Sequence, residues 1–198
     1  MPTARLVVLL SGNGTTLQNL LDRSADGRLP AAVVGVVSSK PDVFGVERAR
    51  RAGVPVVVAE NPSRSETAFA AAREWAADVV VCAGWIHLLS VPPDFRGRVL
   101  NVHPSLLPKF GGKGMYGRRV HEAVLAAGDT ESGCTVHFED DTYDTGPVLL
   151  QHRVPVLPTD TPETLAERVQ VAEREALPEA ITMVAGSGER FQLVPRIQ

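Results

Sequence analysis

The sequence predicts an α/β protein whose mostly parallel, open and twisted sheet carries helices on both faces. Short apolar runs recur in the first half of the chain, at residues 6–10, 31–37, 54–59 and 78–83. These runs are continuous rather than alternating, which is typical of strands buried on both faces. Helix-like segments separate them, and this alternation is typical of a parallel sheet with right-handed crossovers.

Two of the separating segments are expected to be helices. Residues 15–24 carry Leu17, Leu20 and Leu21, and residues 65–77 are rich in alanine. Leucines three or four positions apart lie on one face of a helix, so the first segment can pack that face against the sheet.

The second half of the chain predicts a change in the direction of the strands. A fifth apolar run, residues 99–102, leads into a loop at 106–114 that is rich in glycine and proline, and a helix is expected at 120–127. Two further strands, 134–138 and 148–154, are joined by an acidic connection with a short turn. We expect these two strands to form an antiparallel element.

The last helix has a clear start. Thr161 is the expected cap, Pro162 occupies the first helical position, and Glu163 lies in the first turn. The apolar stripe that would face the sheet consists of Leu165, Val169, Ala172 and Ala176.

Composition limits the possible classes of function. A chain of 198 residues is expected to form one domain and to bury roughly 70% of the surface of its unfolded form. A net charge of -3 and a pI near 6.0 provide no basic field for nucleic acid. The apolar run at 6–10 is too short for a signal peptide core or a membrane span. We therefore expect neither nucleic acid nor a membrane as a partner.

The two cysteines, Cys82 and Cys134, lie among apolar or strand-like neighbours and have no Cys-x-x-Cys spacing. Buried free thiols in a reducing cytoplasm are the favoured interpretation, and a disulfide or a reactive pair is the alternative.

An Asn-x-His motif, Asn101 to His103, ends the fifth apolar run. On a strand these two side chains lie on one face, about 7 Å apart along the chain. Acyl transfer needs such a pair, since one group must hold the oxygen that becomes anionic and the other must move a proton near neutral pH. The alternative is an asparagine that closes a turn beside a surface histidine.

A glycine-containing turn, residues 11–16, joins the first strand to the first helix. Its backbone N–H groups and the positive end of the helix form an anion site, which suggests a bound phosphate monoester. The turn matches neither a dinucleotide fingerprint nor a Walker loop, because Leu17 stands where the third glycine would fall and no Gly-Lys-Ser/Thr follows. A tight turn that merely uses glycine is the alternative.

Asp144 is the best candidate for a carboxylate that would orient His103 and stabilise its charged form. It precedes a turn that can bring its loop over the edge of the sheet, whereas Asp140 and Asp141 could form a solvated acidic surface.

No metal is expected. His121 lacks the second histidine of a zinc helix, and no Cys/His spacing elsewhere suits a metal. His87, His137 and His152 lie in or beside strand-like runs, where we expect packed or partly exposed residues rather than ligands. Serine hydrolysis is weakly supported, since Gly-x-Ser-x-Gly is absent.

Taken together, these motifs resemble the phosphoribosylglycinamide formyltransferases, folate-dependent enzymes of purine synthesis. The resemblance covers nearly the whole chain, with the motifs in the family's order. It rests on residues 10–15, 83–85, 101–108, 135–138 and 144–147.

The resemblance implies a Rossmann-like formyltransferase fold and transfer of a formyl group from 10-formyltetrahydrofolate to the amine of glycinamide ribonucleotide. Residues 1–198 would be one formyltransferase domain, with a phosphate-binding half at about 1–100 and a catalytic, folate-binding half at about 101–198. The family's catalytic residues correspond to Asn101, His103 and Asp144. The partners would be these two small molecules, without a metal, in a cytoplasmic monomer or homodimer.

The resemblance also implies two binding sets. The ribonucleotide set consists of Gly12, Asn13, Gly14, Thr15, Thr16 and Glu173. The folate set consists of Arg64, Ile86, His87, Leu88, Leu89, Asn101, Asp140 and Asp141.

Three features depart from the family pattern. Thr16 stands where asparagine is common, His87 stands where arginine is common, and the loop at 109–119 is longer than in some members. The first change leaves the backbone anion site intact.

Other functions remain open on the sequence. A 10-formyltetrahydrofolate hydrolase or a methionyl-tRNA formyltransferase would use related chemistry, but each usually carries an additional domain. A non-catalytic nucleotide sensor would have no chemical need for Asn101, His103 and Asp144 together.

Overall fold

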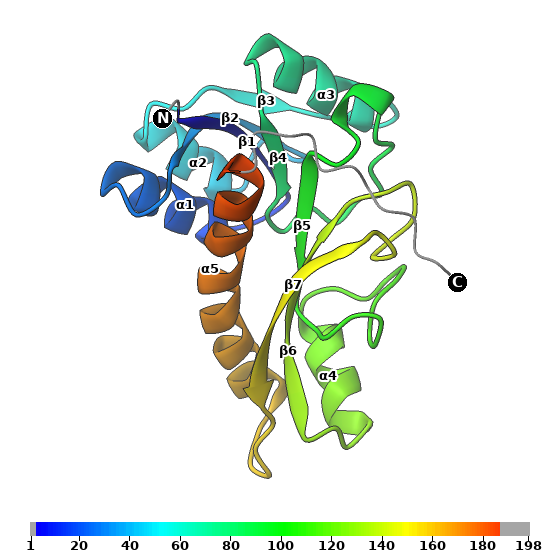
Figure 1. Ribbon diagram of the computed structural model, residues 1–198. Helices are drawn as coiled ribbons and strands as arrows, with labels where there is room; N and C mark the ends of the chain where they lie inside the picture. The colour runs from blue at the N-terminus through cyan, green and yellow to red at the C-terminus, as the bar shows by residue number, and fades with distance from the viewer. Residues whose placement is uncertain (1–2, 187–198) are drawn as a thin grey trace.

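Figure 1 shows the computed structural model of the chain, which describes residues 3–186. Within these residues, seven strands form one sheet in the order β3-β2-β1-β4-β5-β6-β7. The strands are β1 (Ala4–Leu10), β2 (Ala31–Ser38), β3 (Val56–Val58), β4 (Val79–Cys82), β5 (Val99–His103), β6 (Glu131–Phe138) and β7 (Val148–Pro155). The helices are α1 (Thr15–Ala25), α2 (Phe44–Arg51), α3 (Arg64–Glu74), α4 (Arg118–Ala126), α5 (Pro162–Gly186) and the short 3-10 turn η1 (Pro93–Phe95).

The direction of the strands confirms the predicted fold class. Strands β1 to β5 pair in parallel, and β6 and β7 add an antiparallel element at one edge of the sheet. The predicted cap of the last helix is also present, because the Thr164 N–H donates to Thr161 Oγ1 over 3.3 Å. Cys82 and Cys134 are buried free thiols, as expected.

The apolar pattern did not predict α2 or η1. Helix α2 is only 8 residues long, and its sequence FGVERARR is half charged. It buries Gly45, Val46 and Ala49 alone, so its contact with the sheet is too narrow to leave a periodic signal.

Both faces of the sheet are covered, as continuous apolar strands require. Alternate residues of β1 enter two separate cores: Leu6 belongs to the core beneath α1, α4 and α5, and Val7 belongs to the core beneath α3. Figure 1 shows α5 lying along the sheet from β6 and β7 toward α1. The described residues contain no helix long and apolar enough to cross a membrane.

Strand β1 lies where the order of the sheet reverses. It pairs with β2 on one side and with β4 on the other, so the chain leaves β1 and β4 in loops that turn to opposite faces. The Ser11 N–H donates to the Gly84 carbonyl over 3.1 Å, which joins these two loops. Ligands of open α/β sheets bind at such a switch point.

Gly35 provides a test of the packing beneath α3. A Cβ at this position would lie 1.9 Å from the ring of Trp75. We expect Gly35→Ala to lower the free energy of unfolding by about 1–3 kcal/mol, because overpacking forces the ring to move. Urea unfolding measures the change.

Trp75→Leu makes room for the added methyl group, so the double variant should be less destabilised than the sum of the two single variants. Strictly additive free energies would contradict the contact.

Candidate active site

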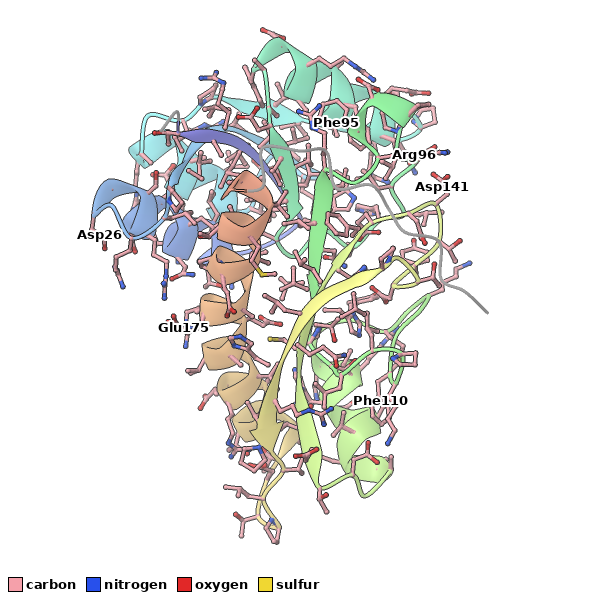
Figure 2. All side chains as sticks on the ribbon, in the orientation of Figure 1. Asp26, Phe95, Arg96, Phe110, Asp141 and Glu175 are labelled. Carbon is pink, nitrogen blue, oxygen red and sulfur yellow. The ribbon has the colours of Figure 1, made fainter. Side chains whose placement is uncertain are left out.

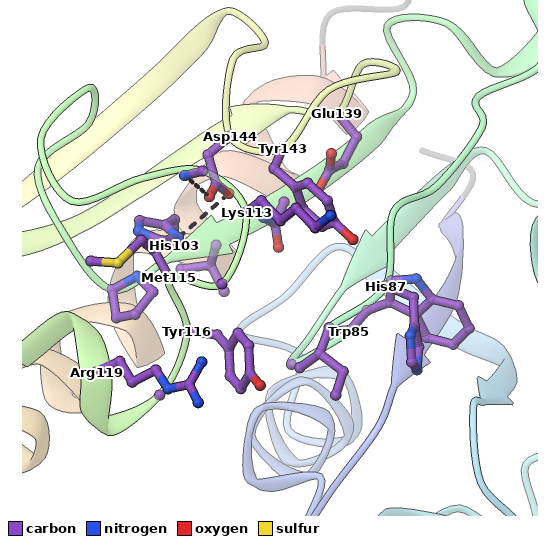
Figure 3. A pocket seen from close by; sticks show the side chains of 18 of the residues that line it. Trp85, His87, His103, Lys113, Met115, Tyr116, Arg119, Glu139, Tyr143 and Asp144 are labelled. Carbon is purple, nitrogen blue, oxygen red and sulfur yellow. Dashed lines mark hydrogen bonds and ion pairs between the residues drawn. The ribbon is translucent and has the colours of Figure 1, made fainter.

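A cavity of about 520 Å³ lies where the segments after β1 and β4 meet the end of β5, the loop that follows it and α5. Figure 3 shows its lining. Eight of the residues singled out from the sequence line it. They are Thr16, Ile86, His87, Leu88, Asn101, His103, Asp144 and Glu173.

His103 is almost fully buried at the end of β5, with 4% of its surface exposed. Its Nε2 lies 2.8 Å from the Phe110 carbonyl. Because a carbonyl oxygen only accepts, we assign a hydrogen to Nε2 and the titrating position to Nδ1. Nδ1 faces Asp144 Oδ1 at 3.4 Å, as the dashed line in Figure 3 shows.

Asp144 is held by the backbone as well as by side chains. Its φ of 58° is left-handed, a conformation that aspartate tolerates better than most residues. Oδ2 accepts the Gly112 N–H over 2.8 Å. Gly111 allows its loop to pack closely against Asp144, because a Cβ at position 111 would lie 3.2 Å from the Asp144 Cβ and 2.5 Å from Leu107.

His137 joins this group, although we expected it to be a packed or partly exposed residue rather than a ligand. It lies opposite Asn101 in the antiparallel pairing of β5 and β6. Its Nε2 is 3.2 Å from Asn101 Nδ2 and 3.6 Å from Asp144 Oδ1. It is fully buried, as expected, and it fixes the amide of Asn101 beside the carboxylate.

The Asp144 carboxylate and the two imidazoles shift one another's pKa. Burial lowers the pKa of His103, and the charge of Asp144 opposes that shift without cancelling it. Burial also acts to lower the pKa of His137, but the contact with Asp144 and the charge of Glu139 outweigh it and raise the pKa. Burial acts to raise the pKa of Asp144, yet its contacts with His137, His103 and Gly112 lower it on balance. At neutral pH an ionised carboxylate therefore lies beside a neutral His103.

The turn between β1 and α1 is the segment that the sequence predicts to bind an anion. Gly14 immediately precedes α1 and has a left-handed backbone conformation. Helix α2 packs against it so closely that a Cβ on Gly14 would lie 2.7 Å from the Gly45 Cα. Thr16 lines the cavity. Gly12, Asn13, Gly14 and Thr15 are not among the residues that line it.

The segment after β4 contributes both apolar and polar groups to the wall of the cavity. Ile86 and Leu88 are exposed apolar side chains, and Trp85 packs edge-on against His87 with 5.6 Å between ring centroids. Among the described residues, Trp85 Nε1 and His87 Nε2 are buried without a hydrogen-bond partner. Leu89 is buried in the core beneath α3 and does not line the cavity.

Arg64, Asp140 and Asp141 lie outside the cavity lining. Arg64 donates to Asn61 at the start of α3. Asp140 Oδ1 accepts from the Thr142 N–H and from Thr145 Oγ1, both over 2.9 Å. Asp141 accepts the Val91 N–H over 3.1 Å and lies 3.9 Å from Arg96 (Figure 2). The two aspartates therefore shape the loop, and their contact with folate stays a prediction.

Several lining residues were not singled out from the sequence. The tyrosine hydroxyl of Tyr143 accepts the Leu88 N–H over 2.9 Å and links the acidic loop to the segment after β4. The remaining unanticipated side chains include Lys113, Met115, Tyr116, Arg119, Glu139 and Gln170. For the first four of these residues, the one available signal in the sequence was the length of the loop at 109–119, which contains them.

Glu173 extends from α5 into the cavity, next to the buried stripe of that helix. Burial raises the pKa of its carboxyl to about 7. Among residues 3–186, no group of three or more histidine, cysteine, aspartate or glutamate side chains is arranged to hold a metal ion.

The cavity and the sheet have counterparts in known proteins. Residues 4–181 match the family described as formyl transferase. The crystal structure of glycinamide ribonucleotide transformylase 1 from Symbiobacterium toebii is 39% identical, with a TM-score of 0.82 over 93% of this chain and 89% of that one.

Curated relatives agree with this match. The chloroplastic phosphoribosylglycinamide formyltransferase of Arabidopsis thaliana is 39% identical over 89% of this chain. The trifunctional purine biosynthetic protein adenosine-3 of Bos taurus is 41% identical over 95% of it. The chain spans 64% of the plant protein and 19% of the bovine protein. Because the matched residues include every strand and the cluster around Asp144, this chain belongs to the formyl transferase family.

Proposed function

We propose that this chain transfers the formyl group of 10-formyltetrahydrofolate to the amine of glycinamide ribonucleotide. One observation carries the proposal: Asn101, His103 and Asp144 meet at one cavity, although Asp144 lies on the loop after β6 and the other two lie on β5. An amide donor, a neutral imidazole and an ionised carboxylate are the groups that acyl transfer to an amine requires.

We assign the two molecules to opposite sides of the cavity. Thr16 and Glu173 line it at the α1 and α5 side and, with the neighbouring turn at residues 12–15, would hold the ribonucleotide. Ile86, His87 and Leu88 would hold the folate, whose ring needs apolar walls and hydrogen-bond partners. The orphaned nitrogens of Trp85 and His87 are suitable partners on that side.

The folate supplies the formyl group, and the residues of this chain stabilise charge and move a proton. Asn101 donates a hydrogen bond to the formyl oxygen as that oxygen becomes negative. His103 Nδ1 takes up the proton that the attacking amine loses and returns it to the leaving nitrogen. Asp144 stabilises the charged imidazole from 3.4 Å, and His137 holds Asn101 in place.

The remaining features of the proposal follow from the same assignment. The N-terminal half, about 1–100, binds phosphate, and the C-terminal half, about 101–198, carries catalysis within a single domain. We further propose a cytoplasmic enzyme that acts as a monomer or homodimer and needs no metal.

The decisive assay follows the loss of 10-formyltetrahydrofolate with and without glycinamide ribonucleotide and identifies the product by mass. We expect turnover only when the ribonucleotide is present. Formyl loss without it would favour a hydrolase, and no reaction would favour a binding module.

Asn101→Ala should lower kcat by about 10²- to 10³-fold, because it removes the donor to the developing oxyanion.

His103→Ala should abolish transfer yet leave ribonucleotide binding intact by calorimetry. His152→Ala is the matched control, since His152 pairs with Glu179 of α5 and does not line the cavity. Full activity in the His103 variant would refute its role.

Asp144→Asn should lower the pKa of His103 further, because it removes the negative charge that favours the imidazolium. An NMR titration of the His103 ring measures this, with its resonance assigned by its loss in His103→Ala. Asp42→Asn, an exposed site, is the control. An unchanged His103 pKa in Asp144→Asn would mean that the carboxylate does not act on this ring.

Glu173→Gln should stabilise the protein at pH 8 by about 1 kcal/mol, or a few degrees in Tm. The folded-state pKa of about 7 lies above the ordinary glutamate value of 4.5, so the stability contributed by this group is lost as pH rises from 4.5 through 7. The advantage of glutamine should therefore shrink at pH 5. Thermal unfolding at both values tests this, and Glu167→Gln on the exposed side of α5 should show no such difference.

A further inference from the structure

Glu139 is a carboxylate in the cavity that the proposed chemistry does not use. It directly follows β6, and its N–H donates to the Val99 carbonyl over 2.9 Å, which fixes the residue beside β5. Alternation along β6 places it on the same face as His137. Its partly buried side chain lines the cavity, and Figure 3 shows it on the opposite side of Tyr143 from His103.

Within the described part of the chain, the Glu139 carboxylate has no hydrogen-bond donor and no ion pair. The three aspartates that follow it all have partners: Asp140 bonds Thr142, Asp141 bonds Val91, and Asp144 bonds Gly112. Glu139 is thus the acid of this segment whose acceptor oxygens are free.

The charges around Glu139 make this free carboxylate costly. Burial raises its pKa to about 7; Asp144 and Asp140 raise it as well, and only the neighbouring His137 acts to lower it. Burying an ionised carboxylate without hydrogen-bond donors raises its free energy. A ligand that brings suitable donors can offset this cost. The cavity therefore offers an acceptor that lacks a partner until a ligand binds.

Other walls of the same cavity suit a flat ring. Trp85 and His87 are stacked edge to face, and Tyr143 is tied to the Leu88 backbone. A carboxylate binds most strongly to two adjacent N–H donors that meet its two oxygens. The 2-amino-4-oxopyrimidine edge of a folate presents such a pair, its ring N–H and its exocyclic amino group.

We propose that Glu139 recognises the 2-amino-4-oxopyrimidine edge of the folate by accepting hydrogen bonds from the ring N–H and the amino group. This makes Glu139 a specificity-determining residue of the formyl-donor site, and it rests on the function proposed above. A pocket with a buried acceptor rejects a ligand that lacks the matching donor, because the acceptor is then left unpaired.

Binding, measured separately from activity, tests this assignment. Calorimetry would compare 5,8-dideazafolate with its 2-desamino-2-methyl analogue, which keeps the ring but loses the amino donor. We expect the wild-type protein to prefer the amino ligand by about 10- to 100-fold. Glu139→Val should reduce this preference to nearly one, and Glu139→Gln should keep part of it, since an amide oxygen can still accept one hydrogen bond.

Glu131→Gln is the matched control, because it neutralises an exposed carboxylate at the other end of β6. It should retain the wild-type preference. Circular dichroism checks that the Glu139 variants are folded, which we expect because each removes a poorly solvated charge.

The possible failures are distinguishable. A wild-type preference that Glu139→Val leaves unchanged would overturn the role of Glu139 and leave the proposed function standing. Failure of the wild-type protein to bind either ligand, together with no formyl transfer, would overturn both proposals. Equal binding of both ligands by an active wild-type enzyme would overturn the role of Glu139 alone.

Discussion

The Asp144 carboxylate connects three parts of the molecule that the chain order keeps apart. It accepts the Gly112 N–H from the loop after β5, faces His103 on β5, and faces His137 on β6. A buried carboxylate is stable only where such partners surround it. The position of each neighbour therefore depends on the others, and the shape of the cavity depends on this one ionised group.

The antiparallel pairing of β6 with β5 makes that arrangement possible. Residues directly opposite each other in an antiparallel pair project to the same face of the sheet. The side chain of His137 therefore lies directly beside that of Asn101. Strand β4 pairs with the other edge of β5, with Cys82 beside Asn101. The segment that follows β4 consequently begins next to Asn101 and lines the cavity from that side.

The parts of the site that could be predicted from the sequence are local. Asn101 and His103 share one strand, so a period of two residues is enough to place them together. The turn at residues 11–16 likewise depends on neighbours in the chain, and its role in binding phosphate stays a prediction. His137 was not anticipated, because its role requires the register of β5 against β6, which apolar periodicity does not contain. Helix α2 was not predicted for a related reason. Its sequence is short and charged, and its close contact with the turn at residues 11–16 is made by Gly45, which adds nothing to an apolar pattern.

Three cavity carboxylates show how the surroundings, rather than the residue type, decide the charge. Asp144 has donors on several sides and its pKa is lowered, whereas burial raises the pKa of Glu139 and Glu173 to about 7. Near neutral pH, one of these three acids is thus ionised next to His103, and the other two are close to their titration points. Those two acids gain most from a donor that a ligand brings, because the protein itself provides little to stabilise their charge. A site of this kind favours ligands rich in N–H and O–H groups, while its permanently ionised acid lies beside His103.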